Sequence, residues 1–235
     1  GVKPKYYFIA GSGNKKNFTK NNLKKISNSL REEQKKYDLL LGGGDTTFSN
    51  KLSFTITSVG YSKKIIYRNQ SNVNNDIYVT GNLGDSFIGL QILKNKIKLN
   101  KSKTKYFINK YYMPDIQNKF SKNLLSLATS SMDISDGLIA DLNKLINKQN
   151  VSYKIYEKSI PVSRNLNNLI NSKNLNKIDL VSNGDDYQIL FTARPNNARI
   201  INKLSKSLGV KISKIGTILS GRNRSSILDQ KGREI

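Results

Sequence analysis

The sequence predicts an α+β fold, and three features support this class. Its 235 residues are enough for one large domain or two small domains with a real hydrophobic core. Short apolar runs typical of strands are mixed with longer segments in which apolar residues recur at helical spacing. These two kinds of segment do not alternate strictly along the chain, which favours α+β.

The strands are predicted from short apolar runs, some continuous and some alternating with polar residues. In chain order they cover residues 5–11, 38–45, 51–60, 76–81, 151–157, 186–193 and 210–218. The second, "DLLLGGGD", is expected to be a buried strand that runs into a glycine turn. The third, "KLSFTITSVG", alternates as a half-buried strand does.

Helices are predicted where apolar residues form one stripe. They cover residues 18–37, 85–96, 115–128 and 196–208, and a further helix follows Asp136, with Leu138, Ile139, Leu142, Leu145 and Ile146 facing the core. The lysine-rich stretch 94–110 is expected to be solvated helix or loop. The polar residues 68–76 interrupt the strands and mark a domain boundary.

The chain is strongly basic, with 40 basic and 16 acidic residues and a formal net charge of +24. Such an excess can indicate a nucleic-acid partner, because Lys and Arg neutralise phosphates. However, Lys, Asn and Ile are abundant in every segment, as codon bias in an AT-rich genome produces. The aromatic residues lie mostly inside strand patterns. We therefore expect no nucleic-acid partner, and a basic nucleic-acid-binding protein remains the alternative of another class.

The absence of cysteine and histidine limits the kinds of catalytic and metal site that the chain can form. Without cysteine the chain has no disulfides and no thiolate metal sites, and without histidine it lacks the usual general base and metal ligand. No apolar run approaches the roughly 20 residues of a membrane span. We therefore expect no membrane partner and a cytoplasmic location.

Acidic residues are scarce, yet several gather at junctions marked by glycine. Of the 16, seven lie at or just before such junctions: Asp45, Asp76, Asp85, Asp133, Asp136, Asp185 and Asp186. Each alone has a local explanation, since Asp and Ser cap helices and glycine permits tight turns; Ser135 or Asp136 could cap the helix that follows. As a set, oxygen ligands in glycine turns favour a hard cation such as magnesium, beside bound phosphate groups. That combination suits phosphoryl transfer.

Five segments carry a family resemblance. "LLLGGGDTT", "YRNQS", "DIYVTGNLGDSFIGL", "SSMDISDGLIADL" and "SNGDDYQILFT" occur in the order found in thiamine-monophosphate kinase, of the aminoimidazole-ribonucleotide-synthetase-like superfamily. The resemblance covers nearly the whole chain and implies the two-domain fold of that superfamily. It also implies transfer of the γ-phosphoryl group of ATP to thiamine monophosphate, giving thiamine diphosphate, with several magnesium ions. The attacking phosphate oxygen is already ionised near neutral pH, so no strong base is needed, which fits the missing histidines.

The resemblance also implies roles for individual residues. The residues that resemble magnesium ligands are Asp45, Asp133 and Asp136, and no catalytic residue is assigned beyond them. The residues that resemble nucleotide contacts are Gly44, Asp45, Arg68 and Ser135. Asp185 stands where the family usually has Glu, a substrate contact, and its side chain is shorter. A carboxylate pair that holds magnesium against a polyphosphate explains Asp133 and Asp136 together better than capping does.

Compared with the family, the chain begins after an acidic, magnesium-binding N-terminal segment and ends before an aromatic-containing tail that contacts thiamine. We therefore expect an interior fragment, inactive alone, of a protein that is a homodimer at full length. Residues 1–72 are predicted to be the incomplete N-terminal ATP- and magnesium-binding domain, and residues 73–235 the C-terminal domain. The alternative with the same fold is another ATP-using enzyme, of the selenophosphate synthetase or purine-pathway synthetase type; "MDISDGLIADL" favours the kinase.

Overall fold

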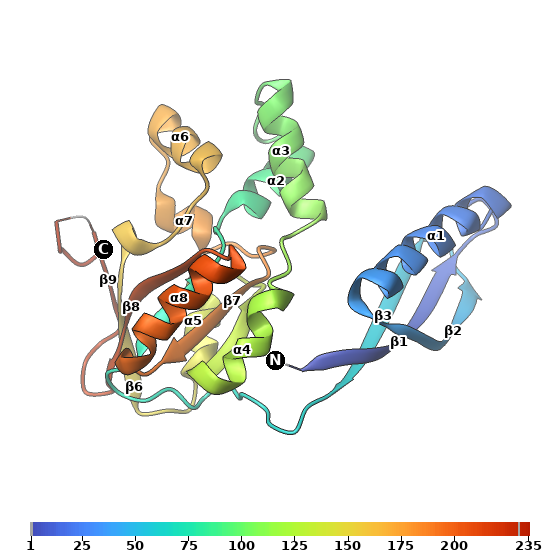
Figure 1. Cartoon of the computed structure of the whole chain (residues 1–235). Coiled ribbons are helices and arrows are strands. Elements are labelled where there is room, and N and C mark those ends of the chain that lie inside the picture. The colour runs from blue at the N-terminus through green and yellow to red at the C-terminus, as the bar shows by residue number, and fades with distance from the viewer. Residues whose placement is uncertain (1, 230) are drawn as a thin grey trace. The chain divides into compact units, whose positions relative to one another are not determined.

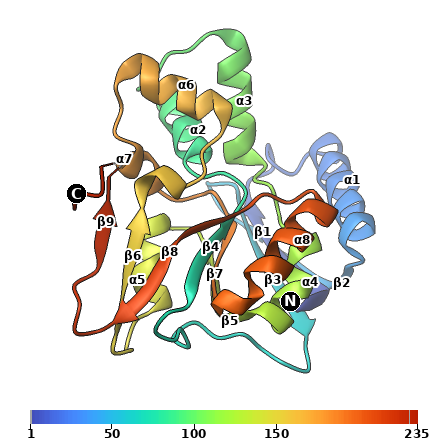
Figure 2. The same cartoon turned by 60° about the vertical axis from the view of Figure 1, so that its left-hand side comes forward.

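The computed structural model describes residues 2–229 and 231–235 and divides into two compact units. The first ends at Ile65, and the second runs from Ile66 to Ile235. Figure 1 and Figure 2 show both units from two sides. Each unit combines a β-sheet with helices, so the predicted α+β class is confirmed. The assignment of functions to residues 1–72 and 73–235 stays a prediction.

The first unit is a three-stranded sheet accompanied by a helix. β1 (Lys3–Gly13) lies in the middle, parallel to β2 (Leu40–Phe48) and antiparallel to β3 (Ser53–Tyr61). α1 (Lys20–Tyr37) begins after Thr19, whose side chain accepts a backbone N–H of the first turn and so satisfies one of the unpaired donors there.

The strands predicted at 38–45 and 51–60 are present, but their surroundings differ from the prediction. Nearly every residue of β2 and β3 is exposed, because these are the two outer strands of a small sheet. The three consecutive glycines lie inside β2 and form no turn. Gly44 lies opposite Ile9, and a Cβ at Gly44 would be 1.9 Å from the Ile9 carbonyl oxygen. Close strand pairing therefore requires this glycine.

The second unit is built on a six-stranded, mainly antiparallel sheet in the order β5-β7-β4-β8-β6-β9. Its strands are β4 (Asp76–Thr80), β5 (Ala128–Ile134), β6 (Val151–Tyr156), β7 (Gln188–Ala193), β8 (Ile212–Ser220) and β9 (Ser226–Leu228). Its α-helices are α2 (Asp85–Leu93), α3 (Lys101–Tyr112), α4 (Asn118–Leu127), α5 (Leu138–Leu145), α6 (Arg164–Lys173), α7 (Lys177–Val181) and α8 (Ala198–Leu208).

Helices bury both faces of this sheet. Because side chains alternate along a strand, Ile77 and Val79 of β4 pack in the core with α5, while Tyr78 packs with α4 and α8. The two views show α4 and α8 together on one side of the sheet and α5 on the other (Figures 1 and 2). A third apolar cluster, which includes Phe107 and Leu166, joins α2, α3, α6 and α7 beyond one end of the sheet.

The strand directions bring several loops together. β7 is antiparallel to both β4 and β5, so the C-terminal ends of β4 and β5 lie beside the N-terminal end of β7. We call this the β4–β5–β7 edge. It carries the α2 loop (residues 81–84), the α5 loop (135–137) and the β7 loop (182–187). Asp76 lies at the other end of β4.

The sequence patterns predict most of these elements but miss β5, β9, α6 and α7. The pattern ends a helix at residue 128, whereas β5 begins there. Two of its hydroxyl residues bond to the neighbouring strand: Thr129 Oγ1 lies 2.7 Å from Thr192 Oγ1, and Ser131 Oγ donates to the carbonyl oxygen of Leu190 at 3.2 Å. α6 lies in an asparagine-rich stretch and buries only two residues, Leu166 and Leu169. No helix among residues 2–229 and 231–235 combines the length and the apolar character needed to cross a bilayer.

Candidate functional site

The α5 loop and the β7 loop are joined through their backbones. The N–H of Asp185 donates to the carbonyl oxygen of Ser135 at 3.0 Å. The N–H of Tyr187 donates to the carbonyl oxygen of Ile134 at 2.8 Å. Two segments about fifty residues apart in the sequence therefore lie side by side at the β4–β5–β7 edge.

Glycines permit this close approach. A Cβ at Gly184 would be 1.8 Å from the carbonyl oxygen of Ser135. A Cβ at Gly137, where φ is +113°, would be 2.1 Å from the carbonyl oxygen of Ser182. Each loop thus supplies the glycine that lets the other loop pack against it.

The side chain of Asp141 holds the backbone of the α5 loop by hydrogen bonds. This side chain is fully buried, and its Oδ2 atom accepts the N–H groups of Ser135 (2.9 Å), Asp136 (2.8 Å) and Gly137 (3.2 Å). Neither Ser135 nor Asp136 caps α5, because Gly137 occupies the capping position without a side-chain bond. A side chain in the first turn of the helix therefore accepts the backbone N–H groups of the loop that precedes it. Sequence reasoning missed this role.

Asp133 and Asp136 are the exposed carboxylates at this edge. Asp133 lies near the end of β5 and Asp136 in the α5 loop, and both are exposed. The Lys144 ammonium contacts the Asp136 carboxylate and lies 2.8 Å from Asp141 Oδ1. These contacts, with Asp136 first, raise the pKa of Lys144. A positive charge already occupies a position between two carboxylates.

The donor set at this edge fits magnesium. Carboxylate oxygens are the ligands that this hard cation prefers, and Lys144 shows that a cation is accepted beside Asp136. Within the part of the chain that the structure describes, no three acidic, His or Cys side chains form a ready-made metal cluster. Asp133 and Asp136 would therefore hold magnesium together with water or phosphate oxygens, as magnesium commonly requires.

Asp185 and Tyr187 form the outer side of the β7 loop. Both have left-handed backbone conformations, with φ of 69° and 51°, which are uncommon for residues other than glycine. Tyr187 is 43% exposed. Burial of the rest of its ring raises the pKa of Tyr187, and the nearby charges of Asp185 and Asp133 add to the increase. Asp133, Asp185 and Tyr187 therefore belong to one electrostatic neighbourhood.

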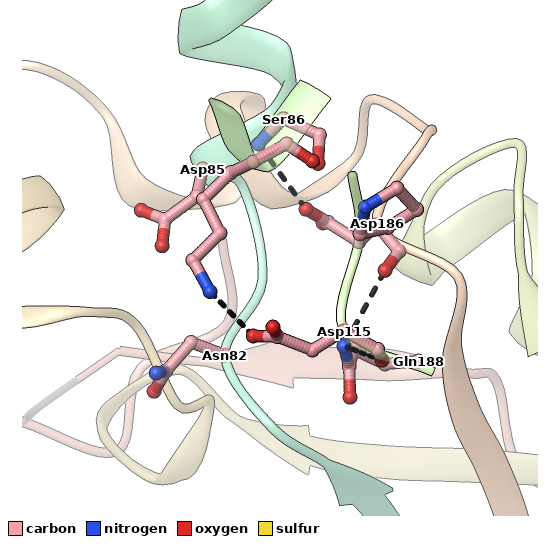
Figure 3. A pocket seen from close by; sticks show the side chains of 8 residues that line it. Asn82, Asp85, Ser86, Asp115, Asp186 and Gln188 are labelled. Carbon is pink, nitrogen blue, oxygen red and sulfur yellow. Dashed lines mark hydrogen bonds and ion pairs between the residues drawn. The ribbon is translucent and has the colours of Figure 1, made fainter. Parts of the chain in front are cut away.

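Asp186, between these two residues, points inward. It is 4% exposed, and its carboxylate accepts the N–H of Gly84 at 2.6 Å, at the start of α2. It also accepts the N–H of Ser86 at 3.4 Å (Figure 3). Burial raises the pKa of Asp186 to about 7, although the two N–H groups lower it.

A second buried carboxylate, Asp85, lies beside Asp186. Its oxygens accept the hydroxyl groups of Ser163 at 2.7 Å and Tyr106 at 2.8 Å. Burial raises the pKa of Asp85, against the effect of these two hydroxyls. The cavity in Figure 3 measures about 20 Å³, enough for about one water molecule. It is lined by Asn82, Asp85, Ser86, Lys110, Pro114, Asp115, Asp186 and Gln188.

The structure thus brings Asp133, Ser135, Asp136 and Asp185 to one edge of the second unit. Gly44 and Asp45 lie on β2 of the first unit, where Asp45 is exposed and its Oδ1 accepts the N–H of Thr46.

Arg68 is exposed in an irregular segment, at a distance from the α5 loop. The N–H of the next residue, Asn69, donates to the carbonyl oxygen of Leu145, in the last turn of α5. The α5 loop precedes the first turn of that helix, so the two positions differ by about 12 Å, the length of an eight-residue helix.

Comparison with known proteins gives a consistent family. Residues 72–229 match the family model described as AIR synthase related protein, C-terminal domain. The chain is 33% identical over 217 residues to the thiamine-monophosphate kinase of Buchnera aphidicola subsp. Acyrthosiphon pisum, covering 91% of this chain and 66% of that protein. It is 32% identical over 221 residues to the Haemophilus influenzae thiamine-monophosphate kinase, covering 93% and 66%. The chain therefore spans about two thirds of the length of these relatives.

Solved structures share the fold. Thiamine-monophosphate kinase from Stenotrophomonas maltophilia matches all of this chain and 74% of its own, with a TM-score of 0.86 and 23% identity. A complex of AaThiL with AMPPCP and TMP matches all of this chain and 72% of its own, with a TM-score of 0.84 and 23% identity. The predicted superfamily fold is confirmed by these matches.

Lys144 should compete with magnesium at the α5 loop. We expect Lys144→Gln to tighten magnesium binding by about two- to fivefold, because an exposed ion pair of this kind is weak but must be broken when the cation binds. Magnesium titration by calorimetry measures the change without any reaction. Lys148→Gln removes the same charge from an exposed position after α5 and should leave the affinity unchanged. Weaker binding in Lys144→Gln would contradict this competition.

Asp186 should make stability depend on pH. Its folded-state pKa of about 7 lies above the ordinary aspartate value of 3.8, so between about pH 4 and pH 7 the folded protein binds more protons than the unfolded chain. The free energy of unfolding should therefore fall as pH rises through this window. Asp186→Asn should flatten this slope in urea titrations, while Asp85, whose pKa is also raised, leaves a residual slope of the same sign. Equal slopes in the two proteins would show that Asp186 ionises normally.

Proposed function

Because the chain belongs to the AIR synthase related protein family, we propose that it takes part in transferring the γ-phosphoryl group of ATP to thiamine monophosphate. One observation carries the proposal. Two of the motifs by which the chain resembles thiamine-monophosphate kinase, "MDISDGL" and "NGDDY", are joined by backbone hydrogen bonds and present Asp133, Asp136 and Asp185 on one edge. The relatives named thiamine-monophosphate kinase, which match over nine tenths of this chain, support the same reaction.

Magnesium, when bound, would neutralise charge on the phosphate groups and orient them. The candidate magnesium ligands of the second unit are Asp133 and Asp136, and the candidate ligand of the first unit is Asp45. The α5 loop is preorganised for this role, because Asp141 fixes its three backbone N–H groups. A fixed loop needs little reorganisation when the charged substrates arrive.

The remaining predicted residues would act on the substrates directly. Ser135, in the α5 loop, and Gly44, in β2, would contact the nucleotide, and Arg68 would neutralise its phosphates from the far end of α5. The acceptor phosphate is ionised near neutral pH, so the proposed reaction needs no histidine base, and the chain contains none.

Asp185 would contact the acceptor. Its position on the outer side of the β7 loop, beside Asp133 and Tyr187, supports this role. The thiazolium ring of thiamine monophosphate is cationic, so a nearby carboxylate and an exposed aromatic ring suit it. AaThiL, which has the same fold, has been solved with AMPPCP and TMP.

The proposal is tested by acceptor specificity. The natural full-length protein should be incubated with ATP, magnesium chloride and one acceptor at a time: thiamine monophosphate, selenide, or an amidine nucleotide of purine synthesis. Thiamine diphosphate and ADP should form with the first acceptor only. Turnover with either of the others, and none with thiamine monophosphate, would favour a different enzyme of the family.

Asp133 should be needed for the reaction and not for folding. We expect Asp133→Asn to lower kcat by roughly 10²- to 10³-fold, as loss of a transition-state contact does. The exposed side chain keeps its shape, so Tm should change by no more than about 2 °C. Asp179→Asn, an exposed carboxylate on α7, is the control and should leave both quantities unchanged. Near-normal turnover in Asp133→Asn would remove this residue from the proposed magnesium site.

A further inference from the structure

The β7 loop holds two side chains in an unfavourable backbone conformation. Asp185 and Tyr187 are both left-handed, at φ of 69° and 51°, and neither is glycine. Such residues persist only where their surroundings determine the conformation, and they occur often at functional sites. The contacts of the residue between them, Asp186, show what determines it here.

Asp186 ties this loop to a different part of the fold. Its carboxylate accepts the N–H groups of Gly84 and Ser86 at 2.6 and 3.4 Å, about 100 residues earlier in the sequence. These are backbone donors at the start of α2 that have no partner within the helix. A carboxylate in this position satisfies them and is favoured by the helix dipole.

The start of α2 is itself a rigid anchor. Gly84 is buried at φ of +85°, and a Cβ there would be 2.9 Å from Leu166 Cδ2. The adjacent Asp85 accepts the hydroxyls of Tyr106, on α3, and of Ser163, the residue that caps the start of α6. Asp186 is therefore bound to a part of the molecule that has little freedom to move.

The alternating directions of the side chains at positions 185, 186 and 187 follow from this anchor. Asp186 points inward to α2, and its two neighbours are forced outward, where Asp185 and Tyr187 lie near Asp133. The backbone bonds of the same two neighbours to Ser135 and Ile134 complete the arrangement. Without the inward carboxylate, the loop would lose the contact that opposes its backbone strain.

We propose that Asp186 is a positioning residue for the acceptor substrate: by binding the backbone at the start of α2, it holds Asp185 and Tyr187 toward the acceptor. The inference rests on the proposed function, because it takes Asp185 as the acceptor contact. It gives the buried carboxylate a part in recognition as well as in folding.

The test compares Asp186 with a matched buried aspartate. Asp76 is equally buried, at 4% exposure, but lies at the opposite end of β4, where it pairs with Lys214 at 2.6 Å. Asp186→Ala should raise KM for thiamine monophosphate by roughly tenfold to a hundredfold, since small misplacements of contact groups have effects of this size. KM for ATP should change by less than about twofold. Asp186→Asn keeps one acceptor oxygen for Gly84 and should have a smaller effect.

Asp76→Ala should lower Tm in the same way but leave both KM values unchanged. If Asp186→Ala raises both KM values equally, or neither, while the protein remains folded, the positioning role is wrong.

A second measurement separates this inference from the proposed reaction. Amide hydrogen exchange of residues 183–189 should be faster in Asp186→Ala than in the unsubstituted protein, and unchanged in Asp76→Ala, because the N–H groups of Asp185 and Tyr187 are bonded only while the loop is held. Unchanged exchange in Asp186→Ala would overturn the anchor itself. Faster exchange in a protein that phosphorylates no thiamine monophosphate would support the anchor and reject only the proposed function.

Discussion

Two buried carboxylates, Asp141 and Asp186, accept five backbone N–H groups at the β4–β5–β7 edge, and the candidate site depends on these bonds. Asp141 takes three from the α5 loop, and Asp186 takes two from the start of α2. A buried backbone donor without a partner is costly, so each carboxylate fixes the loop that it satisfies. Asp136 and Asp185 lie on loops that these two hold in place, and Asp133 lies near the end of the adjoining strand β5.

This division between buried and exposed aspartates is what the sequence could not fully predict. Glycine beside Asp predicted the junctions at the α5 and β7 loops, which the structure contains, and it singled out Asp133, Asp136 and Asp185, whose roles stay predictions. The same signal could not separate Asp185 from Asp186, because adjacent residues in a loop can point in opposite directions. One signal for Asp141 was available: it lies on the helical stripe of Leu138 and Leu145, where a charged residue must be buried and therefore paired.

The fold was predictable where apolar spacing was clear and less so where polar residues form structure. The strands at 76–81 and 210–218 are confirmed in outline because their apolar side chains are buried against helices. β5 was missed because the hydroxyls of Thr129 and Ser131 bond to the neighbouring strand, an interaction that depends on a partner distant in sequence. In β2 the apolar run and the glycines predicted burial and a turn, whereas strand pairing decides their conformation.

Lys144 neutralises part of the negative charge beside the α5 loop. Asp136 and Asp141 place two carboxylates beside the Lys144 ammonium, and like charges that lie close together repel each other when no cation is between them. Lys144 projects from the same helix that carries Asp141, so it neutralises part of this charge as soon as α5 forms. Its partner Asp136 is exposed and Lys144 is partly exposed, so a divalent cation bound at Asp136 would displace the ammonium toward solvent. The Lys144 contact neutralises the loop without a metal, and the predicted competition between the two cations follows from the same contact.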